Sequence, residues 1–260
     1  MKKTYFKLSV AAMALTFMGC GSSGSSGPAL NDGQGVLDLA DYYPTSDISS
    51  KTYVNEVNGT LVGASIQTIE RTDDVITYSE NGNVEEVVTL SDSNITTKEG
   101  EDISTHYRNV DLGERLFSFK ETSTETVDGL GEIPYSVDSE CLLVEKLSEY
   151  EKGMHKYSGD ILKIKCTSDL TTTIDLPVLA LENATLYADY FANSDKYKDL
   201  NGTHKSYNES FLYVQKDIGL IAEIDDDCIS NSLLSLVDDR LDSNSCSDTY
   251  SEYKFYVPSK

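Results

Sequence analysis

Four cysteines in the second half of the chain could form disulfides or bind a metal ion. They are Cys141, Cys166, Cys228 and Cys246. Thiols pair as disulfides or bind zinc as thiolates, and four cysteines allow three disulfide connectivities. No Cys-x-x-Cys spacing occurs, which disfavours a four-thiolate zinc site. We predict the pairs Cys141–Cys166 and Cys228–Cys246, because each brackets one local segment, and expect each bond to contribute about 3 kcal/mol.

Other side chains that enzymes use are present, but not in catalytic arrangements. The three histidines, His106, His155 and His204, are far apart and do not form the His-x-x-x-His spacing of zinc hydrolases. The chain also lacks a Gly-x-Ser-x-Gly elbow and a glycine loop of the phosphate-binding type. The sequence therefore predicts no catalytic residue, no cofactor and a protein that is not an enzyme.

Clustered acids raise the question of calcium, because hard cations prefer several oxygen ligands. The runs are residues 225–227 and the group Asp238, Asp239 and Asp242. Neither run has the EF-hand spacing with its central glycine and terminal glutamate. We predict no metal site and interpret both runs as solvated acidic loops, with calcium binding left open as the alternative.

Three Asn-x-Thr sequons have an acidic residue two positions before the asparagine. Their asparagines are Asn58, Asn94 and Asn201. This arrangement resembles the extended acceptor sequon of bacterial N-glycosylation, which would place these residues in exposed loops. Asn58 and Asn201 also precede glycine, so local Asx-turn chemistry explains the same residues without a glycan. Both interpretations stay open.

The N-terminus has the organisation of a secretory signal, with basic residues first, then an apolar stretch from Leu8 to Met18 that is too short to span a bilayer. Residues 17–20, Phe-Met-Gly-Cys, resemble the bacterial lipobox, in which the cysteine is acylated and becomes the new N-terminus. Leu is usual where Phe17 stands, so ordinary signal cleavage is the alternative. We predict a signal peptide at 1–19, a lipidated Cys20, and a Ser/Gly-rich linker over 20–38.

This resemblance implies a location and a membrane partner. Several acyl chains on Cys20, such as palmitate, would give stable anchoring, since one chain alone binds only marginally. In such lipoproteins Asp after the cysteine favours the inner membrane, whereas here Gly21 favours the outer membrane. We expect a lipid-anchored protein of the bacterial cell envelope, on its periplasmic or surface face. An oxidising compartment also favours disulfides over zinc thiolates.

The chain is strongly acidic, with 44 acidic and 21 basic residues and a formal net charge of −23. Loss of Lys2, Lys3 and Lys7 with the signal peptide would make it −26. This charge repels phosphate backbones, so we predict no nucleic-acid partner. The simplest interpretation is a well-solvated surface, and the alternative is attraction of basic partners or cations.

Residues 39–258 are predicted to form a single β-rich domain. Asn81-Gly82 joins strands at 75–79 and 84–90, and Asn58-Gly59 joins 51–57 to 61–69, because Asn-Gly suits a hairpin turn with positive φ. Antiparallel strands at 141–147 and 161–166 would place Cys141 and Cys166 at one open end, with the return through Gly153 and Gly159. Further strands are expected at 115–120, 211–214, 220–224 and 250–257.

Helix is predicted to be scarce. Residues 232–241 have apolar side chains at 233, 234, 237 and 241, which is one helical stripe inside the Cys228–Cys246 loop. Residues 184–192 fit a helix or a strand equally well. The expected fold is therefore mainly β, a curved antiparallel sheet or half-barrel with one or two short helices, held by disulfides.

Two segments resemble bacterial lipoproteins with an uncharacterised β-rich domain. They are Asp41-Tyr42-Tyr43-Pro44 with Lys51-Thr52-Tyr53, and Tyr213 to Glu223. The resemblance covers about twenty residues and implies a curved sheet distantly similar to lipoprotein-carrier half-barrels. It carries over no catalytic residue.

Two non-catalytic functions follow as hypotheses. The first is a membrane-anchored envelope binding or interaction module, which predicts a filled core and an exposed apolar patch. The alternative is a periplasmic carrier of lipid or another apolar ligand, which predicts a large apolar cavity on the concave face of the sheet. An enzyme would instead need a cleft with convergent acids.

Overall fold

The computed structural model describes residues 35–100, 102–127, 131–182, 187–188, 191–192, 201–229 and 250–258. A single antiparallel sheet of twelve strands makes up most of it, in the order β7-β6-β5-β4-β3-β2-β14-β13-β12-β11-β10-β9. The strands and helices are β1 (Leu37–Asp38), the 3₁₀ helix η1 (Leu39–Tyr42), β2 (Ser50–Val57), β3 (Thr60–Thr72), β4 (Val75–Glu80), β5 (Asn83–Leu90), β6 (Asn94–Glu99), β7 (Asp102–Tyr107), β8 (Asn109–Val110), β9 (Arg115–Val127), β10 (Gly131–Lys152), β11 (His155–Ile174), α2 (Leu176–Glu182), β12 (Gly202–Gln215), β13 (Gly219–Ile229) and β14 (Tyr250–Val257). The prediction of a mainly β, curved antiparallel fold is confirmed.

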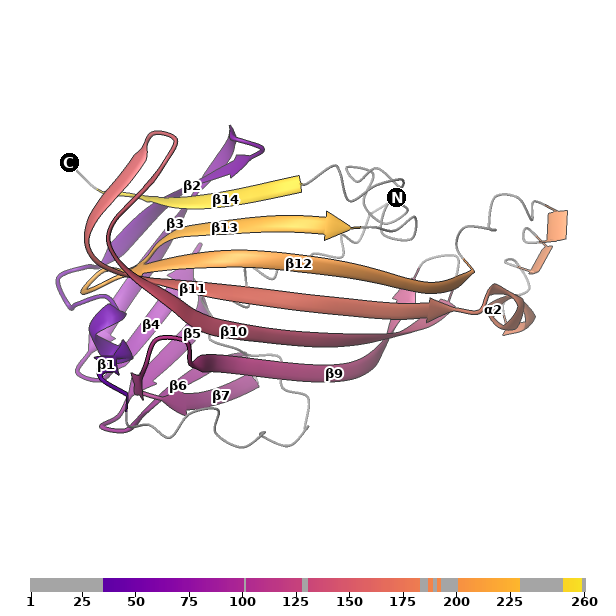
Figure 1. The fold of residues 1–260 in the computed structure, drawn as a ribbon, viewed down its shortest axis with the longest axis horizontal. Coiled ribbons are helices and arrows are strands. Elements are labelled where there is room, and N and C mark those ends of the chain that lie inside the picture. The colour runs from indigo at the N-terminus through magenta and orange to yellow at the C-terminus, as the bar shows by residue number, and fades with distance from the viewer. Residues whose placement is uncertain are drawn as a thin grey trace.

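The sheet curves so that β2–β7 and β9–β14 form two walls around a shared interior (Figure 1). The main core lies between these walls and takes side chains from both. Ile76, Val88 and Ile95 come from one wall, and Leu162 and Ile164 come from the other, and all five are fully buried. This arrangement is a half-barrel with a packed concave face.

The predicted Asn-Gly hairpins are confirmed. Asn58 and Gly59 join β2 to β3 with φ values of 49° and 75°, and Asn81 and Gly82 join β4 to β5 with φ values of 53° and 82°. Two consecutive residues with positive φ are what a type I′ turn requires, and its twist matches that of the flanking strands. Local sequence alone therefore places these turns.

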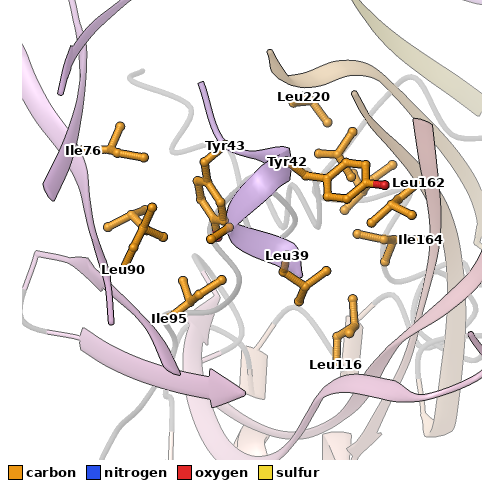
Figure 2. Packing of buried hydrophobic residues seen from close by; sticks show 14 of the residues in the cluster. Leu39, Tyr42, Tyr43, Ile76, Leu90, Ile95, Leu116, Leu162, Ile164 and Leu220 are labelled. Carbon is orange, nitrogen blue, oxygen red and sulfur yellow. The ribbon is translucent and has the colours of Figure 1, made fainter. Parts of the chain in front are cut away.

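The segment that begins at β1 fills the concave face. β1 pairs with β8, and η1 follows directly, with Asp38 accepting a hydrogen bond from the Ala40 N–H. Figure 2 shows Leu39, Tyr42 and Tyr43 in the middle of the interior, between residues of the two walls. Leu37 and Asp38, at the end of the range predicted as linker, therefore belong to the fold, because they pair with β8.

The disulfide Cys141–Cys166 is confirmed, but its place in the hairpin differs from the prediction. The two cysteines face each other in the middle of β10 and β11, not at an open end. The strands extend beyond the predicted ranges because polar, β-branched stretches such as residues 167–173 continue the pairing. The return is at Gly153, whereas Gly159 lies within β11.

The tip of the β10/β11 hairpin extends past Ile161, where the pairing of β11 with β12 ends. This tip bends over the outer face of the sheet (Figure 1). Register shifts between Leu143 and Glu145 and between Leu147 and Glu149 mark the bend. Near the hairpin tip the His155 ring stacks on Phe255 of β14, with ring centroids 4.1 Å apart. This contact closes a second core, formed by Tyr150, Tyr157, Ile161, Tyr213, Ile221, Ala222, Ile224 and Phe255.

Helices are few in the described part of the chain. The helix α2 was not predicted, and the described residues of the ambiguous range 184–192, namely 187–188 and 191–192, are helical. The predicted helix at 232–241 lies outside the described residues. None of the described helices has the length and hydropathy needed to cross a membrane.

Candidate functional site

The two segments that resemble bacterial lipoproteins meet at one end of the half-barrel. Lys51 Nζ donates a hydrogen bond to the Leu220 carbonyl oxygen (3.0 Å), and the Tyr53 hydroxyl donates to the same oxygen (3.3 Å). The Asp217 N–H donates to the Asp41 carbonyl oxygen (2.8 Å), which joins η1 to the β12/β13 turn. The resemblance therefore marks a structural junction.

Gly219 is required at this junction. Its φ is 82°, which favours glycine, and a Cβ at this position would lie 3.0 Å from the Pro44 ring and 3.2 Å from Lys51 Nζ. Any side chain would push the β12/β13 turn away from Lys51 and Pro44. The glycine thus allows the close approach of the two segments.

Ionisable groups are buried beside this junction. Burial lowers the pKa of Lys51 to about 7, with the nearby Lys254 ammonium acting in the same direction. Burial raises the pKa of Glu223 to about 8 and also raises that of Tyr53. In β5, burial and the Glu99 carboxylate raise the pKa of Glu86 to about 8. Loss of water disfavours each charged form.

Glu223 is the most exceptional of these groups. Its side chain is 2% exposed, and neither carboxylate oxygen accepts a hydrogen bond from the described residues. Lys254, whose Nζ lies 4.8 Å from the centre of the Tyr53 ring, partly offsets the rise in the pKa of Glu223. A buried carboxyl without partners is costly as an anion, so it takes up a proton instead.

A cavity with a polar lining lies beside this junction. Its volume is about 320 Å³, and it is lined by Ala40, Asp41, Tyr43, Thr45, Ser46, Arg71 and Asp217. The Arg71 guanidinium already makes one hydrogen bond, from its Nη1 to the Pro44 carbonyl oxygen (2.6 Å). This small, charged cavity differs from the apolar cavity that a lipid carrier requires.

The first half of β3 is a candidate interaction surface. β4 pairs with β3 only from Gln67 to Thr72, so residues 60–66 have a strand partner on the β2 side alone among the described strands. Leu61, Val62 and Ile66 are 64%, 61% and 60% exposed. We call residues 60–66 the β3 edge. Sequence reasoning predicted the strand but missed its exposure, because that depends on where β4 ends.

The predicted sequon asparagines lie on three different parts of the fold. Asn58 is exposed in the β2/β3 turn, and its Oδ1 accepts a hydrogen bond from the Ser251 N–H (3.1 Å). Asn201 is exposed too, and its Oδ1 accepts one from the Leu176 N–H (3.0 Å) at the start of α2. Asn94 begins β6 and is half-buried. Glycosylation stays a prediction.

Cys20 and Cys246 lie outside the described residues, and Cys228 lies in β13. The lipidation and the second disulfide therefore stay predictions. One interpretation was wrong, because residues 225–227 belong to β13 and not to a loop. Asp225 is buried and accepts a hydrogen bond from Asn208 Nδ2 (2.8 Å). In the described part of the chain, no three potential metal-binding side chains gather.

No protein-family profile and no curated protein matches this chain. A solved structure from Bacteroides fragilis, described as a candidate exported protein with a YmcC-like fold, is similar over 80% of this chain and 92% of its own. The sequence identity is 9% and the TM-score is 0.32. A likeness of this size supports no conclusion about function.

Proposed function

We propose that this protein is a lipid-anchored bacterial envelope lipoprotein that acts as a non-catalytic interaction module. The observation that carries the proposal is the filled concave face. Leu39, Tyr42 and Tyr43 occupy the space that a carrier's ligand would need, and all three are less than a tenth exposed. A filled interior leaves the outer surface and the strand edges for binding.

The location rests on the N-terminal sequence and is supported by the disulfide. A Cys141–Cys166 bond suits a protein that folds in an oxidising compartment, since cytosolic thiols are normally kept reduced. The acidic surface suits a protein that stays dispersed and does not bind nucleic acid.

The anchor is tested by Cys20→Ser. This variant should leave the membrane fraction and lose metabolic labelling with palmitate, while the disulfide-bonded domain stays folded. Labelling that persists in Cys20→Ser would refute acylation at this residue. Loss of labelling with unchanged folding separates the anchor from the domain.

The interaction-module function is tested against the carrier alternative. Residues 21–260, purified from an oxidising compartment, are extracted with organic solvent, and the extract is analysed for lipid by mass spectrometry. We expect no lipid at a defined ratio to the folded protein. A stoichiometric lipid would replace the proposal with the carrier, in which residues 39–43 must leave the interior when the ligand enters.

A further inference from the structure

The β3 edge lacks the protection that the outer strands of the sheet carry. Those strands are β7 and β9, and their sequences contain charged residues, Asp102 in β7 and Arg115 and Lys120 in β9. Residues 60–66 contain neither an ionisable residue nor proline. Natural proteins place charge or proline on exposed edges, because open backbone groups pair with other chains. An unprotected edge is therefore a candidate binding site.

The direction of the backbone groups along β3 can be assigned. The Ile69 N–H donates to the Ser49 carbonyl oxygen (2.9 Å), on the side of β2. Alternate residues of a strand direct their backbone groups to opposite edges, so those of Ala64 and Ile66 point away from β2. Both residues are exposed, and β4 ends before it reaches them.

The usable length of the edge is set by a β-bulge. Asn55 pairs with Gly63 and Glu56 pairs with Leu61, so Val62 is the extra residue. Gly63 to Ile66 is the regular stretch, and an incoming strand here would continue the line of β4. Such a strand gains affinity from backbone hydrogen bonds and specificity from side-chain positions.

We infer that the β3 edge binds an extended, basic segment of a partner protein, which joins the sheet as an added strand; this inference rests on the proposed interaction function. The charge of the chain supports a basic occupant, because acidic residues outnumber basic ones by 44 to 21. The end of the added strand would lie beside Glu80, the last residue of β4. Apolar residues of the segment would lie beside Leu61 and Ile66.

A second copy of this chain fits the edge less well. It would bring the same net charge of −23, and like charges oppose association. Charge therefore favours a basic segment of another protein over a second copy as the occupant.

The probe is a fluorescein-labelled peptide, Lys-Val-Thr-Val-Lys-Val-Lys, titrated into the full chain in a nonionic detergent and followed by fluorescence anisotropy. An acidic peptide with Glu in place of each Lys tests the charge. A peptide of the first sequence with N-methyl groups on alternate residues keeps the charge but cannot form the backbone ladder. Only the unmodified basic peptide is expected to bind.

Two variants test the position. Ala64→Pro removes a backbone N–H on the free edge and leaves the β2 ladder intact, and Ile66→Lys adds a charge. Each should weaken peptide binding by about tenfold or more, which is about 1.4 kcal/mol. Val84→Lys is the matched control for Ile66→Lys, because Val84 of β5 is 62% exposed and lies outside the β3 edge. It should leave peptide binding unchanged. Ile66→Lys keeps the test valid if Ala64→Pro fails to fold.

Three results would overturn the inference. The first is binding that both edge variants leave unchanged, and the second is equal binding of the acidic or the N-methylated peptide. The third is a dimer, seen by analytical ultracentrifugation, that Ala64→Pro abolishes, since a second copy would then be the occupant. Each leaves the interaction-module function standing, whereas stoichiometric lipid in the extraction experiment would refute that function.

Discussion

Arg108 binds both carboxylate oxygens of Asp38, although the two residues are 70 positions apart. Nε donates to Oδ1 at 2.7 Å and Nη2 donates to Oδ2 at 2.6 Å. Nη1 of the same guanidinium donates to the Ser91 carbonyl oxygen (3.1 Å), and Asp38 caps η1. The pair therefore ties the segment in the interior to the wall that contains β5–β7.

The Arg108–Asp38 pair should contribute measurably to stability. Arg108→Lys keeps the positive charge but cannot form the bidentate hydrogen bonds to Asp38. The free energy of unfolding, measured in urea, should therefore fall by about 1 kcal/mol. The control is Lys120→Gln, which removes an exposed ion pair with Asp138 and should change nothing. Equal effects of the two substitutions would contradict the special role of Arg108.

The same pair predicts a response to acid. The Arg108 guanidinium beside Asp38 holds the pKa of that carboxyl below its ordinary value of 3.8. A carboxyl with a lowered pKa stabilises the folded state above its unfolded pKa, and this contribution is lost as the pH falls through the folded pKa. In Asp38→Asn the loss of stability between pH 5 and pH 3 should therefore be smaller than in the unmodified protein, measured by urea unfolding.

Glu223 should make the protein less stable as the pH rises. Burial raises the pKa of Glu223 to about 8 from 4.5, so between these values the folded state holds a proton that the unfolded state has released. Stability then falls with pH by at most about 1.4 kcal/mol per unit for this carboxyl. Glu223→Gln should flatten the decline between pH 5 and pH 8 in urea unfolding. Identical slopes for both proteins would contradict the burial of a protonated Glu223.

Lys51 should act in the opposite direction at higher pH. Burial lowers the pKa of Lys51 to about 7 from 10.5, so in this range the unfolded state binds the extra proton. Stability therefore rises with pH from about 7 to 10. Lys51→Met should remove that rise, whereas Lys156→Met, on an exposed side chain, should keep it. A rise that survives in Lys51→Met would assign it to another group.

Tyr43 and Tyr157 offer a matched pair of hydroxyl deletions. The buried Tyr43 hydroxyl has no hydrogen-bond partner among the described residues, whereas the Tyr157 hydroxyl donates to the Tyr256 carbonyl oxygen (2.7 Å). Tyr43→Phe should be neutral or stabilising, and Tyr157→Phe should cost about 1 kcal/mol, because only the second breaks a bond. Thermal unfolding checks the sign, and a loss in Tyr43→Phe would indicate an ordered partner at its hydroxyl.

The sequence predicted the parts of this fold that depend on local chemistry. Asn58-Gly59 and Asn81-Gly82 specify their turns by positive φ, and Cys141 and Cys166 lie on the two strands of one hairpin, so each feature could be predicted from nearby residues. The strand at 250–257 was also predicted with its observed bounds.

The parts that sequence could not predict depend on distant contacts. Leu39 is an ordinary leucine in the sequence, and its interior position follows from the pairing of β1 with β8 and from Arg108. The β3 edge is exposed because β4 ends at Glu80, which no residue of β3 encodes. The burial of Glu223 likewise depends on the folded sheet, and its electrostatic neighbour Lys254 comes from β14.

β14 is the strand that joins the two walls of the sheet. β2 to β7 and β9 to β13 are each runs of neighbours along the chain, and β14 joins them by pairing with β2 on one side and β13 on the other. β14 is therefore synthesised after the other strands of the sheet. Pairing of β14 with β2 closes a loop of nearly two hundred residues, which is the kind of contact that slows folding. Without β14, no strand pairing among the described residues would connect the two walls, so the continuity of the sheet depends on its last described strand.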